Sequence, residues 1–141
     1  MKITILNGSP DSQSDFEAHL EQVEHVLAGD GHTVHMFTLR EMDIRSCVGC
    51  FGCWVKTPGE CFSPDESSQV RRTVIDSDFL LWAAPLQMGF PNSLLKIMLD
   101  KSIPLIHPYF VVEHGEAHHR PRYDHYPRLG LLLGREEDTD E

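Results

Sequence analysis

Long hydrophobic runs are absent from this sequence. No apolar stretch approaches the roughly 20 residues that a membrane-spanning helix needs, so we expect no membrane span. Basic residues are scarce as well: 12 Lys and Arg against 22 Asp and Glu give a formal net charge of −10. Because phosphate binding needs a basic surface, this charge argues against a nucleic-acid partner. No repeat, low-complexity linker or second-domain signal is present, and 141 residues suit a single domain.

The N-terminus lacks the pattern of a signal peptide. The apolar run at residues 1–6 is followed at once by Asn7-Gly8-Ser9-Pro10, and it is too short for the apolar core of such a peptide. We therefore expect a cytoplasmic protein in a reducing compartment. The P-loop pattern G-x-x-x-x-G-K-[ST] is also absent, which argues against a nucleotide hydrolase of that class.

Cysteine is missing everywhere except in one short stretch. The four cysteines are Cys47, Cys50, Cys53 and Cys61, with gaps of two, two and seven residues. This spacing is typical of a loop around one iron–sulfur cluster, since close ligands need tight turns and one ligand returns from outside. Gly49 and Gly52 suit those turns, because glycine adopts a positive φ at little cost, and Pro58-Gly59 suits the bend of the return.

Three other interpretations of the cysteines stay open. Disulfides need an oxidising compartment, which the N-terminus does not indicate. Structural zinc sites usually pair two separated Cys-x2-Cys units, and this sequence has no second unit. Free or redox-active thiols on a loop without metal require no further sequence feature.

Strand and helix signals alternate along the chain. Apolar runs predict strands at residues 3–6, 33–39, 79–84 and 129–133, the third of them ended by Pro85. Helical periodicity predicts helices between them, the first two opened by the capping-box pairs Ser14 with Glu17 and Ser63 with Glu66, the third by Asn92 or Ser93. This alternation predicts one α/β domain over residues 1–141, with three layers and a parallel sheet in the order 2-1-3-4.

Two loops follow the first and third predicted strands at their carboxyl ends, where open parallel sheets bind ligands. Residues 8–14 offer small hydroxyl side chains and the backbone N–H groups of a helix start, which suit a phosphate. Residues 85–93 offer backbone amides and a flat apolar face, which suit a planar ring. The simpler interpretation of both loops is an ordinary connection from strand to helix.

The two loops, with the cysteines between them, give a resemblance to a known family. Over residues 1–134 the chain resembles the flavodoxin-like NADPH-dependent FMN reductase family, in particular its iron–sulfur flavoprotein branch. The matching motifs are Asn7-Gly8-Ser9-Pro10 with Ser12 and Ser14, the Cys47-x2-Cys50-x2-Cys53-x7-Cys61 loop, and Ala84-Pro85-x3-Gly89 with Leu95-Lys96 and Asp100-Lys101.

The resemblance implies cofactors and their ligands. The FMN phosphate would be held by Ser9, Pro10, Ser12 and Ser14, and the isoalloxazine ring would be lined by Pro85, Leu86, Gln87, Met88 and Gly89. A [4Fe-4S] cluster would be held by Cys47, Cys50, Cys53 and Cys61. NAD(P)H would give a hydride to the flavin, and because hydride transfer needs no general acid or base, we name no catalytic residue.

The sequence departs from the family pattern at two points. Asp11 stands where the family usually has a basic residue, and a carboxylate beside a phosphate weakens binding unless it points away. The family also continues into a fifth strand and a closing helix, so we expect a sheet shortened at its C-terminal side. Its unprotected edge and the apolar segment at Leu105-Ile106 predict a homodimer or a larger assembly. The acidic run at residues 135–141 is expected to be a solvated end.

A histidine- and tyrosine-rich insert is expected at residues 105–128. Histidine-rich tracts can bind metal, and His114 and His118 have an i, i+4 spacing. The simpler interpretation is a polar loop at a subunit interface or over the flavin. Phe51 and Trp54, beside the cysteines, are expected to be packing residues.

Three functions agree with these features. The first is an FMN-dependent NAD(P)H oxidoreductase whose cluster passes single electrons to an unknown acceptor. The second is a cluster-free, FMN-dependent reductase of quinones or nitro compounds. The third is a shortened flavodoxin-like module that binds no flavin and serves as a binding partner.

Overall fold

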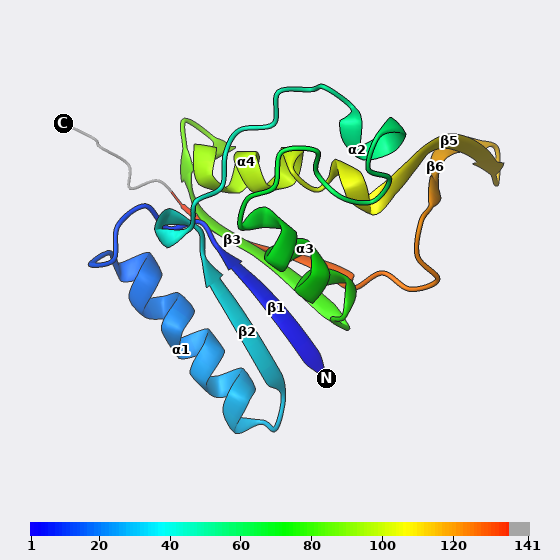
Figure 1. The fold of residues 1–141 in the computed structure, drawn as a ribbon. Coiled ribbons are helices and arrows are strands. Elements are labelled where there is room, and N and C mark those ends of the chain that lie inside the picture. The colour runs from blue at the N-terminus through cyan, green and yellow to red at the C-terminus, as the bar shows by residue number, and fades with distance from the viewer. Residues whose placement is uncertain (136–141) are drawn as a thin grey trace.

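The computed structural model describes residues 1–135 and is built around a parallel sheet (Figure 1). Its strands are β1 (Lys2–Asn7), β2 (Thr33–Thr38), β3 (Phe79–Gln87), β4 (Phe90–Pro91), β5 (Ile106–Glu113), β6 (Glu116–Pro121) and β7 (Arg128–Gly134). Its α-helices are α1 (Asp15–Gly29), α2 (Gly52–Val55), α3 (Ser67–Ile75) and α4 (Ser93–Asp100), and its 3-10 turns are η1 (Leu39–Glu41) and η2 (Ile103–Leu105). None of the helices in the described part of the chain is long and apolar enough to span a bilayer.

The main sheet confirms the strand order predicted from the sequence. β2, β1, β3 and β7 pair in parallel in this order, and β7 is the fourth predicted strand. β3 is central, so that Trp82 pairs with Leu6 on one side and with Leu131 on the other. α1 covers one face of the sheet, and α3 and α4 cover the other, which completes the expected three layers (Figure 1). Of the predicted acidic end at 135–141, residues 136–141 lie outside the described part of the chain.

Each face of the sheet has its own apolar core. Ile3, Ile5 and Leu20 are buried on the side of α1. On the side of α3 and α4, the buried residues include Leu6, Val70, Val74, Leu80, Trp82, Leu95 and Met98. Because side chains alternate along a strand, Ile5 and Leu6 belong to different cores.

The helix starts confirm two of the three predicted caps. Ser14 Oγ accepts the N–H of Glu17 at 3.2 Å, and Asn92 Oδ1 accepts the N–H of Leu95 at 3.2 Å. The predicted capping box from Ser63 to Glu66 is wrong, since α3 begins only at Ser67. There the Asp65 carboxylate accepts the N–H of Ser67 at 3.0 Å.

Two further predictions need correction. β3 does not end before Pro85 but continues to Gln87. The missing N–H of Pro85 is tolerated because it belongs to the side of β3 where β1 has already ended at Asn7. The insert at residues 105–128 contains an antiparallel hairpin, β5–β6, with a register shift between Ile106 and Phe110 and a turn whose residues His114 and Gly115 both have positive φ. β5 carries the continuous run Tyr109-Phe110-Val111-Val112 and β6 carries histidine and arginine, so neither strand shows an apolar alternation in the sequence.

Candidate functional site

The first and second predicted ligand loops meet at the carboxyl end of the sheet. Asn92 Nδ2 donates to the carbonyl oxygen of Gly8 at 2.5 Å, and the N–H of Gly8 donates to the carbonyl of Ala83 at 2.7 Å. A Cβ on Gly8 would lie 3.1 Å from both the Ala83 oxygen and the Cβ of Ala84. Glycine therefore lets the first loop lie directly against β3 and α4.

The first loop presents hydroxyl groups at the N-terminus of α1. Ser9 is fully buried, and its Oγ donates to the carbonyl of Asp11 at 2.9 Å and lies 3.2 Å from Ser14 Oγ. Ser12 is exposed to solvent. The first N–H groups of a helix have no partner within the helix, so this end of α1 suits an anion. The predicted phosphate residues thus gather at one place, with Ser9 below the surface and Ser12 on it.

The carboxylate of Asp11 bends back onto its own loop. Asp11 Oδ1 accepts the N–H of Gln13 at 2.9 Å. The negative charge that departs from the family pattern is thereby held by a hydrogen bond with the backbone rather than directed freely into solvent.

A buried ionic network of Asn7, Glu17 and Arg40 holds this loop in place, and it was not predicted from the sequence. The Glu17 carboxylate accepts two hydrogen bonds from Asn7 Nδ2, both at 2.9 Å, and two from Arg40, at 3.0 and 3.1 Å. Asn7 Oδ1 accepts the N–H of Ser9 at 2.8 Å, and Arg40 Nη1 donates to the carbonyl oxygen of Ser9 at 3.3 Å. Both polar groups of the Ser9 backbone are therefore held by side chains from β1 and η1.

The charges of this network stabilise each other. Burial alone would raise the pKa of Glu17, but the hydrogen bonds from Arg40 and Asn7 outweigh it, and the pKa of Glu17 is lowered. The pKa of Arg40 is raised by its hydrogen bond with Glu17. The sequence contains only a weak indication of this network, because Glu17 has the position of the last residue of a capping box. In the structure the Glu17 side chain is buried instead.

The second loop is a tight hairpin rather than an open connection. Pro85, Leu86 and Gln87 belong to β3, and Met88 and Gly89, with φ of 52° and 78°, form the turn to β4. Met88 is 88% exposed. The residues predicted to line a flavin ring therefore form one continuous edge that projects from the sheet beside the first loop.

All four cysteines line a single pocket of about 240 Å³, together with Phe62, Lys101 and Ile103 among others. They are free thiols, Cys47 and Cys50 exposed and Cys53 and Cys61 half-buried. Gly49 has the expected positive φ, and Gly59, in the predicted bend of the return, has a positive φ as well. Gly52 does not, since Phe51 takes the left-handed conformation and Gly52 starts α2. The glycine is needed for space instead, because a Cβ there would lie 2.8 Å from the Cβ of Phe62.

A cation, Lys101, lies at the wall of this pocket, and a carboxylate, Asp65, pairs with it. Lys101 Nζ donates to Cys61 Sγ at 3.3 Å and lies 2.8 Å from Asp65 Oδ2. Burial alone would raise the pKa of Asp65, but its hydrogen bonds, above all from Lys101, lower it from 3.8 to about 2. The pKa of Cys53, in contrast, is raised. Burial of the thiol raises this pKa, and the neighbouring cysteines raise it further.

The four thiols do not form a ligand set for a single metal ion in the part of the chain that the structure describes. Within residues 1–135, no three His, Cys, Asp or Glu side chains come together as a site for one metal ion. Four thiolates around one zinc ion, at about 2.3 Å each, would have to converge on a point. A cluster would need its four thiolate ligands at separate corners, and the observation here is that all four cysteines line one pocket.

Four histidines of the insert, His107, His114, His118 and His119, lie in the β5–β6 hairpin, and His125 follows it with Nε2 3.2 Å from the carbonyl oxygen of Ser77. The His119 ring packs between Phe110 at 4.5 Å and Trp54 at 5.6 Å, measured between ring centroids. Trp54 also stacks on Phe51 and donates from Nε1 to the carbonyl of Ile106 at 3.0 Å. Trp54 thus packs the cysteine loop against β5–β6, as predicted, whereas Phe51 stacks on Trp54 and is 49% exposed.

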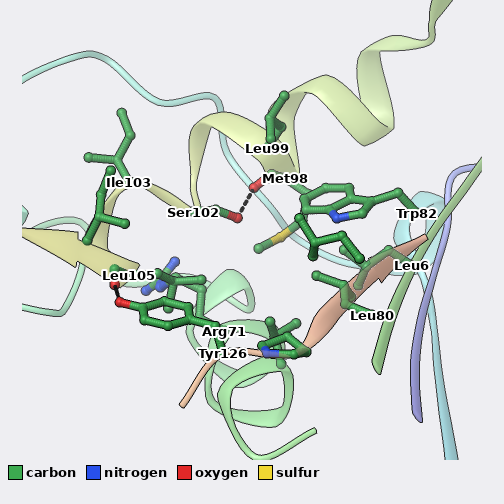
Figure 2. Close-up of a pocket in the computed structure, with 14 residues that line it drawn as sticks. Leu6, Arg71, Leu80, Trp82, Met98, Leu99, Ser102, Ile103, Leu105 and Tyr126 are labelled. Atoms are coloured by element: carbon green, nitrogen blue, oxygen red, sulfur yellow. Dashed lines mark hydrogen bonds between the residues drawn. The ribbon is translucent and has the colours of Figure 1, made fainter. Parts of the chain in front are cut away.

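An apolar cavity of about 380 Å³ lies between α4 and β7 (Figure 2). Figure 2 shows Leu80, Trp82, Met98 and Leu99 on its walls, with Tyr126 at the far end. A second apolar groove shares Trp82, Leu99 and Leu129 with it and extends along the outer face of β7 to Leu131. This face of the sheet is therefore only partly covered by α4.

Comparison with known proteins identifies relatives of this chain. The family described as NADPH-dependent FMN reductase matches residues 1–117. An iron–sulfur flavoprotein of Methanocaldococcus jannaschii is 24% identical over 105 residues, which are 74% of this chain and 53% of the relative. An iron–sulfur flavoprotein of Archaeoglobus fulgidus is 27% identical over 107 residues, which are 76% of this chain and 48% of the relative. The chain thus spans about half the length of the curated relatives it matches.

Solved structures share the fold. A putative quinone reductase from Klebsiella pneumoniae superposes with a TM-score of 0.67 at 14% identity, over 96% of this chain and 59% of that protein. RosB, with a bound 8-demethyl-8-formylriboflavin-5'-phosphate, superposes with a TM-score of 0.69 at 18% identity, over 98% of this chain and 53% of RosB. At these identities the likeness concerns the flavodoxin-like fold.

Proposed function

The chain belongs to the NADPH-dependent FMN reductase family, and on that premise we propose that it is an NAD(P)H-dependent oxidoreductase that binds FMN at the carboxyl end of its sheet. The observation that carries the proposal is the junction of the two ligand loops through Asn92 and Gly8, directly beside the N-terminus of α1. The N-terminus of α1 suits a phosphate, and the second loop suits a planar ring. The phosphate and the ring of one ligand could therefore bind side by side at this junction.

The residues of this site have separate tasks in the proposal. Ser9, Pro10, Ser12 and Ser14 surround the phosphate, and the N–H groups of the first turn of α1 complete its hydrogen bonds. Pro85, Leu86, Gln87, Met88 and Gly89 form the edge against which the ring lies. The flavin supplies the hydride chemistry when bound, while the protein orients it and leaves one side of the ring open to the nicotinamide.

We further propose that the cysteine pocket holds one [4Fe-4S] cluster, with Cys47, Cys50, Cys53 and Cys61 as its ligands. Its support is the common pocket of the four thiols, the positive charge of Lys101 at its wall, and the two iron–sulfur flavoproteins among the relatives. The cluster supplies one-electron transfer to an outside acceptor. Free thiols and such a cluster need a reducing compartment, so we assign the protein to the cytoplasm in this proposal.

Association with a second copy is part of the same proposal. Leu129 and Leu131, on the edge strand β7, are 69% and 70% exposed and border the apolar grooves. An edge strand with an exposed apolar face is a site of association. We therefore propose a homodimer or a larger assembly.

Anaerobic purification followed by a visible spectrum and an FMN titration tests the function. Bound FMN gives bands near about 370 and 450 nm and a cluster a broad shoulder near about 400 nm, which belong to the cofactors themselves. Flavin bands that bleach on addition of NADH or NADPH are the expected result. Flavin reduction without the shoulder after reconstitution with iron and sulfide would assign a cluster-free reductase. No FMN binding at all would leave the binding-module hypothesis.

A further inference from the structure

Lys101 is a buried cation with a thiol as one of its few partners. Its side chain, at the C-terminal end of α4, is only 3% exposed, and that of its partner Asp65 is not exposed at all. Placing an ammonium group in such a position is unfavourable unless its charge is compensated. Asp65 supplies that charge at 2.8 Å, and Cys61 Sγ accepts a hydrogen bond at 3.3 Å.

Asp65 joins this lysine to the opposite end of the cysteine loop. The loop spans residues 45–62, and the N–H of Arg45, at its entry, donates to Asp65 Oδ2 at 3.0 Å. Cys61, at its return, is held by Lys101. This ion pair therefore connects the two ends of the loop, together with the hydrogen bonds that join Asp43 to Glu66 and Arg45 to the carbonyl of Pro64.

Arg71 of α3 attaches the return of the loop to the helices. It donates to the carbonyl of Lys101 at 3.1 Å and to Ser67 Oγ at 2.7 Å, and its Nη2 lies 3.4 Å from Glu60 Oε2. Arg71 lies in the wall of the apolar cavity (Figure 2). The contacts of Lys101 are thus fixed from both α3 and α4.

We propose that Lys101 is a positioning residue for the cysteine pocket: it holds the sulfur of Cys61 at the pocket wall and, with Asp65, keeps the entry and the return of the loop together. The part of this inference that concerns a bound cluster rests on the proposed function. There, a buried positive charge with an N–H···S bond favours the state with one more electron, because net charge and hydrogen bonds to sulfur set the potential of such a centre.

The test compares Lys101→Met with Lys96→Met. Lys96 is a matched control, since it lies on the same helix but is solvent-exposed and pairs with Asp100 instead of the loop. In the metal-free full chain, Lys101→Met is expected to speed amide hydrogen exchange about tenfold at the loop ends, including Arg45 and Glu60, whose N–H groups are hydrogen-bonded, while Lys96→Met leaves it unchanged. Equal exchange in the wild type and in Lys101→Met overturns the inference, whether or not a cluster forms.

The reconstituted protein gives a second, separate readout. Lys101→Met is expected to lose iron to a chelator about tenfold faster than the wild type and to have a more negative midpoint potential in an electrode titration. Unchanged iron loss and potential overturn the tuning role of Lys101. If the wild type takes up no iron, the proposed cluster fails, and the exchange measurement still decides whether Lys101 holds the loop.

FMN affinity distinguishes a local effect from general unfolding. The flavin loops lie at the N-terminal end of α4 and Lys101 at the other end, so Lys101→Met is expected to keep its FMN affinity within about twofold. If that variant does not fold, Cys61→Ala tests the same contact from the other partner. It is expected to speed exchange at Gly59 and Glu60, whose N–H groups are hydrogen-bonded, and to leave Arg45 protected, and no change at Gly59 and Glu60 overturns the inference.

Discussion

Asn92 performs two tasks with one side chain. Its Oδ1 caps α4 through the N–H of Leu95, and its Nδ2 holds the carbonyl of Gly8. The start of the third main helix and the position of the first ligand loop are therefore coupled at a single residue. The sequence predicted the cap from the preference of asparagine for that position, but not the bond to Gly8, which depends on how closely β1 and β3 approach.

Ser14→Glu tests the placement of the phosphate at the residue scale. The change puts a negative charge at the first turn of α1 and removes the hydroxyl, so FMN binding is expected to be lost. Ser14→Ala is the matched control, because it removes the cap at a cost of about 1 kcal/mol in stability without adding charge. Affinities are measured by flavin fluorescence quenching with FMN and with riboflavin, which has no phosphate. Undiminished FMN retention in Ser14→Glu would refute the placement.

Asp65 predicts how stability changes in acid. Its pKa is lowered in the folded protein from 3.8 to about 2, so its contribution is complete above the unfolded value of 3.8 and is lost as the pH falls toward 2. In Asp65→Asn, Lys101 keeps its charge without a partner, and unfolding is expected to be easier by about 3–5 kcal/mol at neutral pH. Urea unfolding is measured between about pH 5 and pH 2.5. The difference in the free energy of unfolding between the wild type and Asp65→Asn should become smaller as the pH falls. A gap independent of pH would contradict the ion pair.

At the scale of elements, the sequence predicted the helices and strands that have a clear hydrophobic periodicity. The buried strand at residues 79–84 and the amphipathic start of α1 follow from apolar spacing, and both are confirmed. The predicted start of α3 was wrong because Asp65 forms an ion pair with Lys101, which lies 36 residues later in the chain. β5 and β6 were missed because His119 and its neighbours are held by aromatic packing on Trp54, which no local pattern indicates.

Trp54→Ala tests the attachment of the β5–β6 hairpin to the cysteine loop. Trp54 is half-buried, so its removal is expected to destabilise the fold by about 2 kcal/mol, less than the loss of a fully buried tryptophan. Trp54→Phe keeps the ring contacts with Phe51 and His119 but loses the hydrogen bond to Ile106, and about 1 kcal/mol is expected. Urea unfolding measures both. Equal, negligible effects would show that the hairpin is held elsewhere.

At the scale of the whole molecule, the sheet formed by residues 1–135 has two unequal edges. β2 is followed directly by η1 and the cysteine loop, whereas β7 carries exposed leucines along the side of the sheet that α4 covers only in part. Burying apolar surface stabilises association by about 25 cal/mol per Å² before the entropy of association is subtracted. The apolar grooves between α4 and β7 therefore make this edge the natural interface of the proposed dimer.

Leu131→Lys tests that interface. Leu131 is 70% exposed beside the groove, so the change adds charge to the apolar face while removing few contacts within the chain. The wild type is expected to sediment as a dimer or a larger species at micromolar concentration, and Leu131→Lys as a monomer with nearly unchanged unfolding in urea. Val26→Lys is the matched control, because Val26 is also an exposed apolar residue but lies on α1, and it should leave the assembly intact. A wild-type monomer in light scattering at the same concentration would contradict the dimer, and dissociation by both variants would show that net charge rather than this face controls association.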